Sequence, residues 1–177
     1  FKDELVINDA VLAIEFAKQN EATAASQLAQ EAVALSDSLT TEYPNNIIYW
    51  KTRVRTFASL SQFNPAYLTP ALEAIQTANK LAPTDAKVSY NLGLVYSRTN
   101  QIDKAIKTFE NTIKLKKNYK DAYYELALAY RQKAIDTSGK VIHKDYEKKA
   151  IDTMQFILDN FDEKDPQVLK TLEEWKK

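Results

Sequence analysis

The chain has 177 residues, 45% of them hydrophobic, enough apolar content for one sizeable core or for a stack whose core runs along its length. It holds only two glycines and five prolines, too few for the many tight turns of an all-β protein, so composition favours helices. It has no cysteine and a formal net charge of zero, which excludes disulfides, thiolate metal sites and a strongly charged surface overall.

The charge is unevenly distributed along the chain. Residues 1–50 carry two lysines and eight acids, whereas residues 98–149 carry thirteen lysines and arginines and seven acids. We therefore expect the two ends of the molecule to differ in electrostatic potential. No apolar run approaches the roughly 18 residues of a membrane span. Because the chain starts at Phe1 without a methionine, we expect it to be a soluble piece of a longer protein.

Residues 1–44 are expected to form a degenerate helical hairpin, closed by Pro44. Apolar residues recur there at the three-and-four spacing that places side chains on one face of a helix. The expected apolar positions are Leu5, Leu12 and Phe16 in the first helix, and Leu28, Val33 and Leu35 in the second.

A repeat of about 34 residues organises the middle of the chain. This offset aligns Leu92, Gly93, Leu94 and Tyr96 with Leu126, Ala127, Leu128 and Tyr130. The unit at residues 86–119 is a predicted helical hairpin. Its second helix should begin after Asn100, a predicted N-cap, with Asp103 in its first turn.

The unit at 86–119 resembles the tetratricopeptide repeat through Leu92, Gly93, Tyr96, Ala105 and Phe109. A preceding repeat over residues 45–83 carries Trp50 and Phe57 at the aromatic positions and ends at Pro83. A following repeat over 120–165 is split by an insertion at about 135–144, and its second helix is expected to begin late, at Ala150. Asp165 and Pro166 predict the start of a capping helix over 166–177.

This resemblance implies one all-α domain over residues 1–177, an α-α superhelix of about four hairpins plus the capping helix. Each hairpin alone cannot bury its apolar face, so stacking supplies the stability. The small residues are expected where two helices approach closely. These are Gly93, Ala105, Ala127 and Ala150.

Nothing in the sequence predicts catalysis, a cofactor or a metal site. His143, the single histidine, falls in the insertion and is expected to be a solvated loop residue. Asp162, Glu163 and Asp165 lack the spacing of a calcium loop and are expected to form a solvated connection. The lysines around Lys114 and Lys149 are interspersed with acids, so we expect a solvated face and no nucleic-acid partner.

A concave groove is the surface that the resemblance assigns to binding. In tetratricopeptide proteins the first helices of successive hairpins line a surface that receives an extended peptide or a partner helix. The corresponding positions here are Lys51, Arg55, Lys87, Tyr90, Asn91, Leu94, Arg98, Tyr124, Glu125, Leu128 and Arg131. The two tyrosines could contact a peptide or merely cover the helix surface, and the sequence leaves both readings open.

One subclass of the family clamps a terminal carboxylate with two lysines, an arginine and two asparagines. Lys51 and Asn91 match that pattern, but Arg55 stands at an asparagine position. Asp121 and Glu125 stand where the second lysine and the arginine are required. Each acid would repel a carboxylate ligand by about 1 kcal/mol or more, so we do not expect this clamp.

Three interpretations of function remain open at this stage. The first is a non-catalytic scaffold that binds a protein or peptide in the groove. The second rests on residues 46–57, which contain Trp50, Arg53 and Arg55 and resemble the tail of bacterial O-antigen ligase or polymerase-like membrane proteins. A membrane would then be reached only through a missing upstream segment. The third is self-association into a homo-oligomer.

Overall fold

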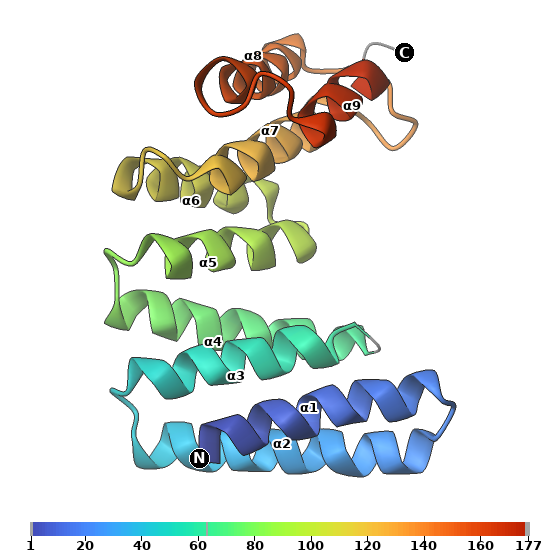
Figure 1. The fold of residues 1–177 in the computed structure, drawn as a ribbon, viewed down its shortest axis with the longest axis vertical. Helices are drawn as coiled ribbons and strands as arrows, with labels where there is room; N and C mark the ends of the chain where they lie inside the picture. The colour runs from blue at the N-terminus through green and yellow to red at the C-terminus, as the bar shows by residue number, and fades with distance from the viewer. Residues whose placement is uncertain (1, 63, 176–177) are drawn as a thin grey trace. The chain divides into compact units, whose positions relative to one another are not determined.

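The computed structural model describes residues 2–62 and 64–175, and it confirms the all-α prediction for them (Figure 1). The described chain forms α1 (Lys2–Lys18), α2 (Ala22–Glu42), α3 (Ile47–Leu60), the short 3₁₀ helix η1 (Pro65–Tyr67), α4 (Leu68–Leu81), α5 (Ala86–Arg98), α6 (Ile102–Leu115), α7 (Lys120–Ala134), α8 (Lys144–Asn160) and α9 (Pro166–Trp175). Phe1 and the last two residues of the predicted 166–177 helix lie outside the described residues. No described helix is long and apolar enough to cross a bilayer.

The helices form two compact units, residues 1–83 with α1 to α4 and residues 84–177 with α5 to α9. Each unit has a core of its own, and each is described by itself below. The prediction that residues 1–177 make a single domain stays a prediction.

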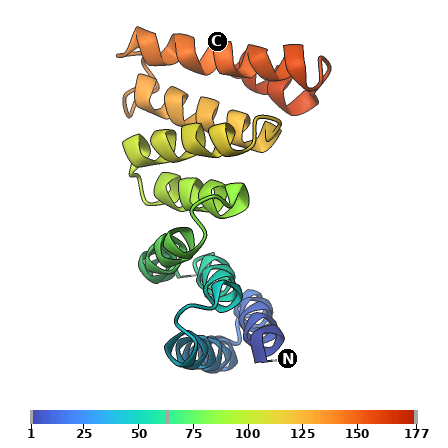
Figure 2. The ribbon, with the colours of Figure 1, turned by 90° about the vertical axis from the view of Figure 1, so that its left-hand side faces the viewer.

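In the first unit, α1 and α2 form a hairpin, α3 packs on both of them, and α4 packs on α3 (Figures 1 and 2). The core between α1, α2 and α3 consists mainly of small side chains, which allows the helix backbones to approach closely. Its buried members are Ala10, Ala13, Ala29, Ala32 and Leu60.

The predicted apolar face of α1 is wrong in detail. Leu5 and Leu12 are each 47% exposed, whereas Val6, Ala10 and Ala13 are buried. Positions 6, 10 and 13 lie on one face of a helix, and positions 5, 12 and 16 lie on another, so α1 carries apolar residues on two faces. The close approach of the alanines decides which face is buried, and the larger leucines remain outside.

The polar residues around α3 serve the fold of the first unit. Asn46 caps α3, with its Oδ1 accepting from the N–H of Ile48 at 3.0 Å. The Trp50 indole N–H donates to the Pro44 carbonyl at 2.7 Å. Arg53 forms an ion pair with Asp37 of α2, and its guanidinium lies 4.7 Å from the Phe57 ring centre. Trp50 and Arg53, two of the residues that carry the membrane-protein resemblance, therefore have structural partners here.

In the second unit, α5 pairs with α6, α7 packs on α6 and α8, and α9 packs on α8. The small residues lie where helices approach, as predicted. Ala105, Ala127 and Ala150 have no exposed surface, and a Cβ added at Gly93 would lie 2.4 Å from the Phe109 ring.

The predicted N-cap role of Asn100 is wrong, because this residue ends α5 instead of starting α6. Asn100 has φ 56° in the left-handed region, which asparagine tolerates better than most residues. The Gln101 N–H donates to the Tyr96 carbonyl at 2.8 Å and the Asn100 N–H to the Ser97 carbonyl at 3.0 Å. These two bonds make a Schellman motif, which satisfies carbonyls at the end of α5.

The insertion at 135–144 forms an ordered loop, and α8 begins earlier than predicted. Asp136 Oδ1 accepts hydrogen bonds from the N–H of Ser138 at 2.8 Å and of Lys140 at 3.0 Å. These bonds stabilise the tight turn through Gly139, whose φ is 84°. The α8 helix starts at Lys144 rather than Ala150, and its first turn is held by Tyr146, which packs against a core cluster, and by Glu147, which pairs with Arg131 of α7.

Candidate peptide-binding site

The predicted groove residues are divided between the two units. Lys51 and Arg55 lie on α3 of the first unit, where Lys51 is half-buried and Arg55 is exposed. All the other predicted residues lie on α5 and α7 of the second unit. The candidate site is therefore built from the second unit alone.

A cavity of about 190 Å³ brings three of the predicted residues together. Tyr90 reaches it from α5, and Tyr124 and Glu125 reach it from α7. The remaining lining residues come from the start of α7 and from α8 and α9, and they are Lys120, Asp121, Ile157, Asp165, Gln167 and Val168. The capping helix thus forms one wall of the site, which the groove prediction did not include.

Tyr90 forms the aromatic side of this cavity. Its ring centre lies 5.0 Å from that of Tyr119 and 6.0 Å from that of Phe109, so the ring is held by two neighbours. Burial, and then the carboxylates of Glu125 and Asp121, raise the pKa of Tyr90 well above its usual value. The phenol therefore stays protonated at neutral pH and can donate a hydrogen bond.

Tyr124 is held by the capping helix. Its hydroxyl lies 3.0 Å from Thr171 Oγ1 of α9, within hydrogen-bond distance. Thr171 Oγ1 also donates to the Gln167 carbonyl at 2.8 Å, which leaves Tyr124 to donate to Thr171. The tyrosine thus joins α7 to α9 while one side of it borders the cavity.

Glu125 is a half-buried acid with a second acid one turn before it. Burial raises the pKa of the Glu125 carboxyl; the positive charge of Arg98 opposes that rise, and the negative charge of Asp121 adds to it. Because Asp121 and Glu125 both line the cavity, its α7 wall is negative at neutral pH. A neutral or basic group is favoured there over a carboxylate.

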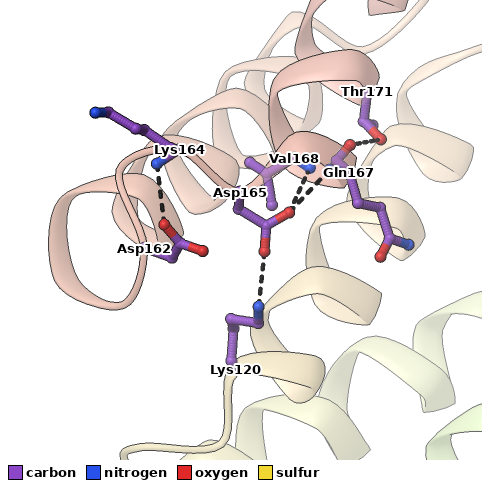
Figure 3. A network of polar contacts seen from close by, with 7 residues as sticks. All are labelled: Lys120, Asp162, Lys164, Asp165, Gln167, Val168 and Thr171. Atoms are coloured by element: carbon purple, nitrogen blue, oxygen red, sulfur yellow. Dashed lines mark hydrogen bonds and ion pairs between the residues drawn. The ribbon is translucent and has the colours of Figure 1, made fainter.

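Asp165 and Lys120 both line the cavity, and Figure 3 shows how they pair with each other. Asp165 is 6% exposed, and its Oδ2 accepts from the Lys120 ammonium at 2.7 Å. Its Oδ1 accepts from the N–H groups of Gln167 at 2.9 Å and Val168 at 3.0 Å, so it caps α9. The hydrogen bond from Lys120, supported by that of Val168, lowers the pKa of Asp165.

This network confirms the predicted helix start and corrects the predicted solvated turn. Asp162 and Glu163 are exposed, but Asp165 is buried and paired across the fold. The Asp-Pro sequence indicates the cap locally, whereas Lys120 lies far away along the chain, and no short-range pattern could indicate that ion pair.

The remaining predicted residues of the second unit lie outside the cavity lining. Leu94 and Leu128 pack against the apolar core clusters. Arg131 pairs with Glu147 of α8 at 2.7 Å, and its guanidinium lies 5.6 Å from the Trp175 ring centre, so it joins three helices. The other three are Lys87 and Arg98, which are exposed, and Asn91, which is half-buried.

In the part of the chain that the structure describes, no group of three or more His, Cys, Asp or Glu side chains is placed to hold a metal ion. His143 is exposed beside Tyr146, with ring centres 6.4 Å apart. What the second unit offers is a small polar cavity with tyrosine and carboxylate walls.

Comparison with known proteins supports the repeat assignment. The family model described as "Tetratricopeptide repeat" matches residues 87–115, which cover most of α5 and all of α6. No curated protein matches the chain. The fold is that of the tetratricopeptide type of helical repeat, which is typical of non-catalytic scaffolds for protein–protein interaction.

Solved structures with the same fold cover most of the chain. TTC0263, a thermophilic TPR protein from Thermus thermophilus, is similar with a TM-score of 0.60 and 15% identity, over 95% of this chain and 97% of that one. MamA from Desulfovibrio magneticus RS-1 is similar with a TM-score of 0.60 and 20% identity, over 89% of this chain and 76% of that one. MamA MSR-1 is similar with a TM-score of 0.54 and 17% identity, over 83% of this chain and 75% of that one. At these identities the similarity shows the fold alone.

Proposed function

We propose that the chain is a non-catalytic scaffold that binds a peptide or partner segment, and that the cavity between α5, α7 and α9 receives it. The observation that carries this proposal is the meeting of Tyr90, Tyr124 and Glu125 in one cavity. Rigid tyrosines supply contact area and a hydrogen-bond donor at low entropic cost. A half-buried carboxylate supplies a charge that a ligand can neutralise.

The ligand should carry a neutral or basic side chain at the position that enters this cavity. Asp121 and Glu125 disfavour a carboxylate there, which is also why the terminal-carboxylate clamp of the family is not proposed. A cation beside Glu125 would stabilise its charged form and so offset the effects of burial and of Asp121, which raise the pKa of its carboxyl. Binding should therefore lower the pKa of Glu125.

A random linear-peptide library panned on the purified chain tests this proposal. The affinity of each enriched peptide is then measured for the wild type, Glu125→Gln, Tyr90→Phe and the control Lys107→Ala, which changes an exposed residue of α6. We expect basic residues among the enriched peptides and a loss of about tenfold with Glu125→Gln, roughly the value of one charged hydrogen bond. Unchanged affinity in both site variants would refute the site, and circular dichroism checks that each variant is folded.

A second proposal is that the chain is the soluble tail of an O-antigen ligase or polymerase-like membrane protein. It is supported by the residue pattern at 46–57 and by no other feature of the chain. The reading frame upstream of Phe1 tests it. Several apolar segments of about 20 residues would support the proposal, and a soluble upstream domain would end it.

A further inference from the structure

Several side chains that line the cavity between α5, α7 and α9 have polar atoms without a hydrogen bond or an ion pair in the described part of the chain. They are the hydroxyl of Tyr90, the carboxylates of Asp121 and Glu125, and the side-chain amide of Gln167. Other polar groups of the lining are already paired, Lys120 with Asp165 and Tyr124 with Thr171. The unpaired groups therefore determine what the cavity can still bind.

The charge of these unpaired groups is negative. Asp121 and Glu125 lie one turn apart on α7, and Glu125 is half-buried, so water screens its charge less than that of an exposed acid. Lys120 and Asp165 neutralise each other. Arg98 opposes the charge of Glu125, but it is exposed and does not line the cavity. A cation with several N–H donors is the group that satisfies this lining.

The size of the cavity fits one side chain of a partner. Its volume of about 190 Å³ is well below the roughly 300 Å³ at which pockets for whole small molecules begin. At about 30 Å³ for each water, the cavity has room for roughly six water molecules. An arginine side chain, with about seven non-hydrogen atoms, is of similar size. The rest of the partner therefore stays outside the cavity.

The positions of the acceptors favour a planar cation over a point charge. They reach the cavity from three helices, Tyr90 from α5, Glu125 from α7 and Gln167 from α9. An arginine guanidinium carries donors on several edges of a plane, whereas a lysine ammonium carries its donors on one atom. The guanidinium is also less strongly hydrated and can lie against an aromatic ring such as that of Tyr124. It therefore loses less hydration free energy on entering a half-buried cavity.

We propose that the cavity is an anchor for one arginine side chain of the partner, and that it discriminates against lysine. This inference rests on the proposed function, because it names the side chain that enters the same cavity. The two carboxylates of α7 pair with the guanidinium, and the Tyr90 hydroxyl and the Gln167 amide oxygen accept its remaining N–H groups. Two aromatic neighbours already hold the Tyr90 ring, so little freedom is lost on binding.

Exchanging arginine in the ligand tests the proposal. In each peptide enriched on the purified chain, every arginine is replaced singly by lysine and by citrulline, which has nearly the same shape without the charge. At one arginine we expect the affinity to fall by about fivefold or more with lysine and by about tenfold or more with citrulline. Peptides that bind without arginine, or that tolerate lysine at every position, would overturn the anchor and leave the proposed function standing. The absence of any enriched peptide would contradict the proposed function, and this inference with it.

Variants of the chain test whether that arginine enters this cavity. The loss of affinity from arginine to lysine should shrink toward zero with Glu125→Gln. It should also shrink with Asp121→Asn, a second variant with little risk to folding because Asp121 is exposed. The matched control is Asp152→Asn, which removes the same charge from an exposed residue of α8 outside the cavity and should keep the full loss. An equal loss in the wild type and in both cavity variants, all folded by circular dichroism, would place the arginine elsewhere and overturn the proposal.

Discussion

At the scale of single residues, Gly93 shows how one missing side chain sets a distance between helices. The Phe109 ring is fully buried and occupies the space where a Cβ on Gly93 would lie, 2.4 Å from the nearest ring atom. Because Phe109 also contacts Tyr90, the same close approach holds one wall of the candidate cavity. Packing in α5 and α6 and the geometry of the candidate site therefore depend on one position.

Replacing Gly93 with alanine should destabilise the chain by about 1–2 kcal/mol. Overpacking a dense core costs about 1–3 kcal/mol, and the better helix propensity of alanine returns about 0.5–1 kcal/mol. Chemical denaturation followed by circular dichroism measures the free energy of unfolding. In the double variant with Phe109→Leu, the smaller side chain should absorb part of the clash, so the double variant should lose less stability than the sum of the two single losses. A neutral or stabilising Gly93→Ala would contradict the packing described here.

At the scale of elements, the start of α9 depends on Asp165, which caps the helix and pairs with Lys120 of α7. Asp165→Ala removes both interactions, and we expect a cost of about 1–2 kcal/mol, of which a cap is worth about 1 kcal/mol. The ion pair contributes the smaller part, because the Lys120 side chain is 41% exposed. Asp165→Asn keeps an acceptor for Gln167 and Val168, so it should cost less. Equal losses for the two variants would contradict this division.

The same carboxylate should give the stability a dependence on acid pH. The pKa of Asp165 is lowered in the folded state below the value of 3.8 that it would otherwise have. The folded state therefore binds this proton less well than the unfolded chain does, and the stabilisation is present in full above the unfolded pKa. It is lost as the pH falls through the folded pKa. Thermal melts from pH 7 to pH 3 should show a smaller loss for Asp165→Asn than for wild type, and parallel curves would exclude the effect.

Local sequence signals predict helix starts that depend on neighbouring residues. They do not predict which face of a helix is buried, because residues far along the chain determine that. The Asp165 and Pro166 pair indicated the start of α9 because a cap and its helix are adjacent. Asn100 was assigned to the wrong helix, because a residue between two helices can end one or begin the next. The buried face of α1 was missed because two apolar faces share one periodicity, and only contact with α2 and α3 selects between them.

At the scale of the whole molecule, the sequence predicted a stack of hairpins but not its division into two compact units. The repeat pattern is the same on both sides of Pro83, so nothing in the periodicity marks a boundary there. The pattern also placed Lys51 and Arg55 in one groove with residues of α5 and α7. In the structure, the cavity that gathers predicted residues belongs to residues 84–177 alone. Helix α9 forms one wall of the cavity. That wall is held in place by contacts between residues far apart in the sequence, such as that of Tyr124 with Thr171.

The fragment 84–177 should fold without the first unit. Its two core clusters, one around Phe109 and Tyr130 and the other around Met154 and Ile157, draw their buried residues from α6 to α9. In a repeat protein stability is close to a sum of neighbouring interfaces, so the interfaces within this fragment should suffice for a cooperative transition. The shorter fragment 120–177 lacks Phe109 and the rest of α6, and it should be less helical and melt without a sharp transition. Circular dichroism melts of both fragments make the comparison. A non-cooperative melt of 84–177 would show that its fold depends on residues 1–83 and would favour the single-domain interpretation of the sequence.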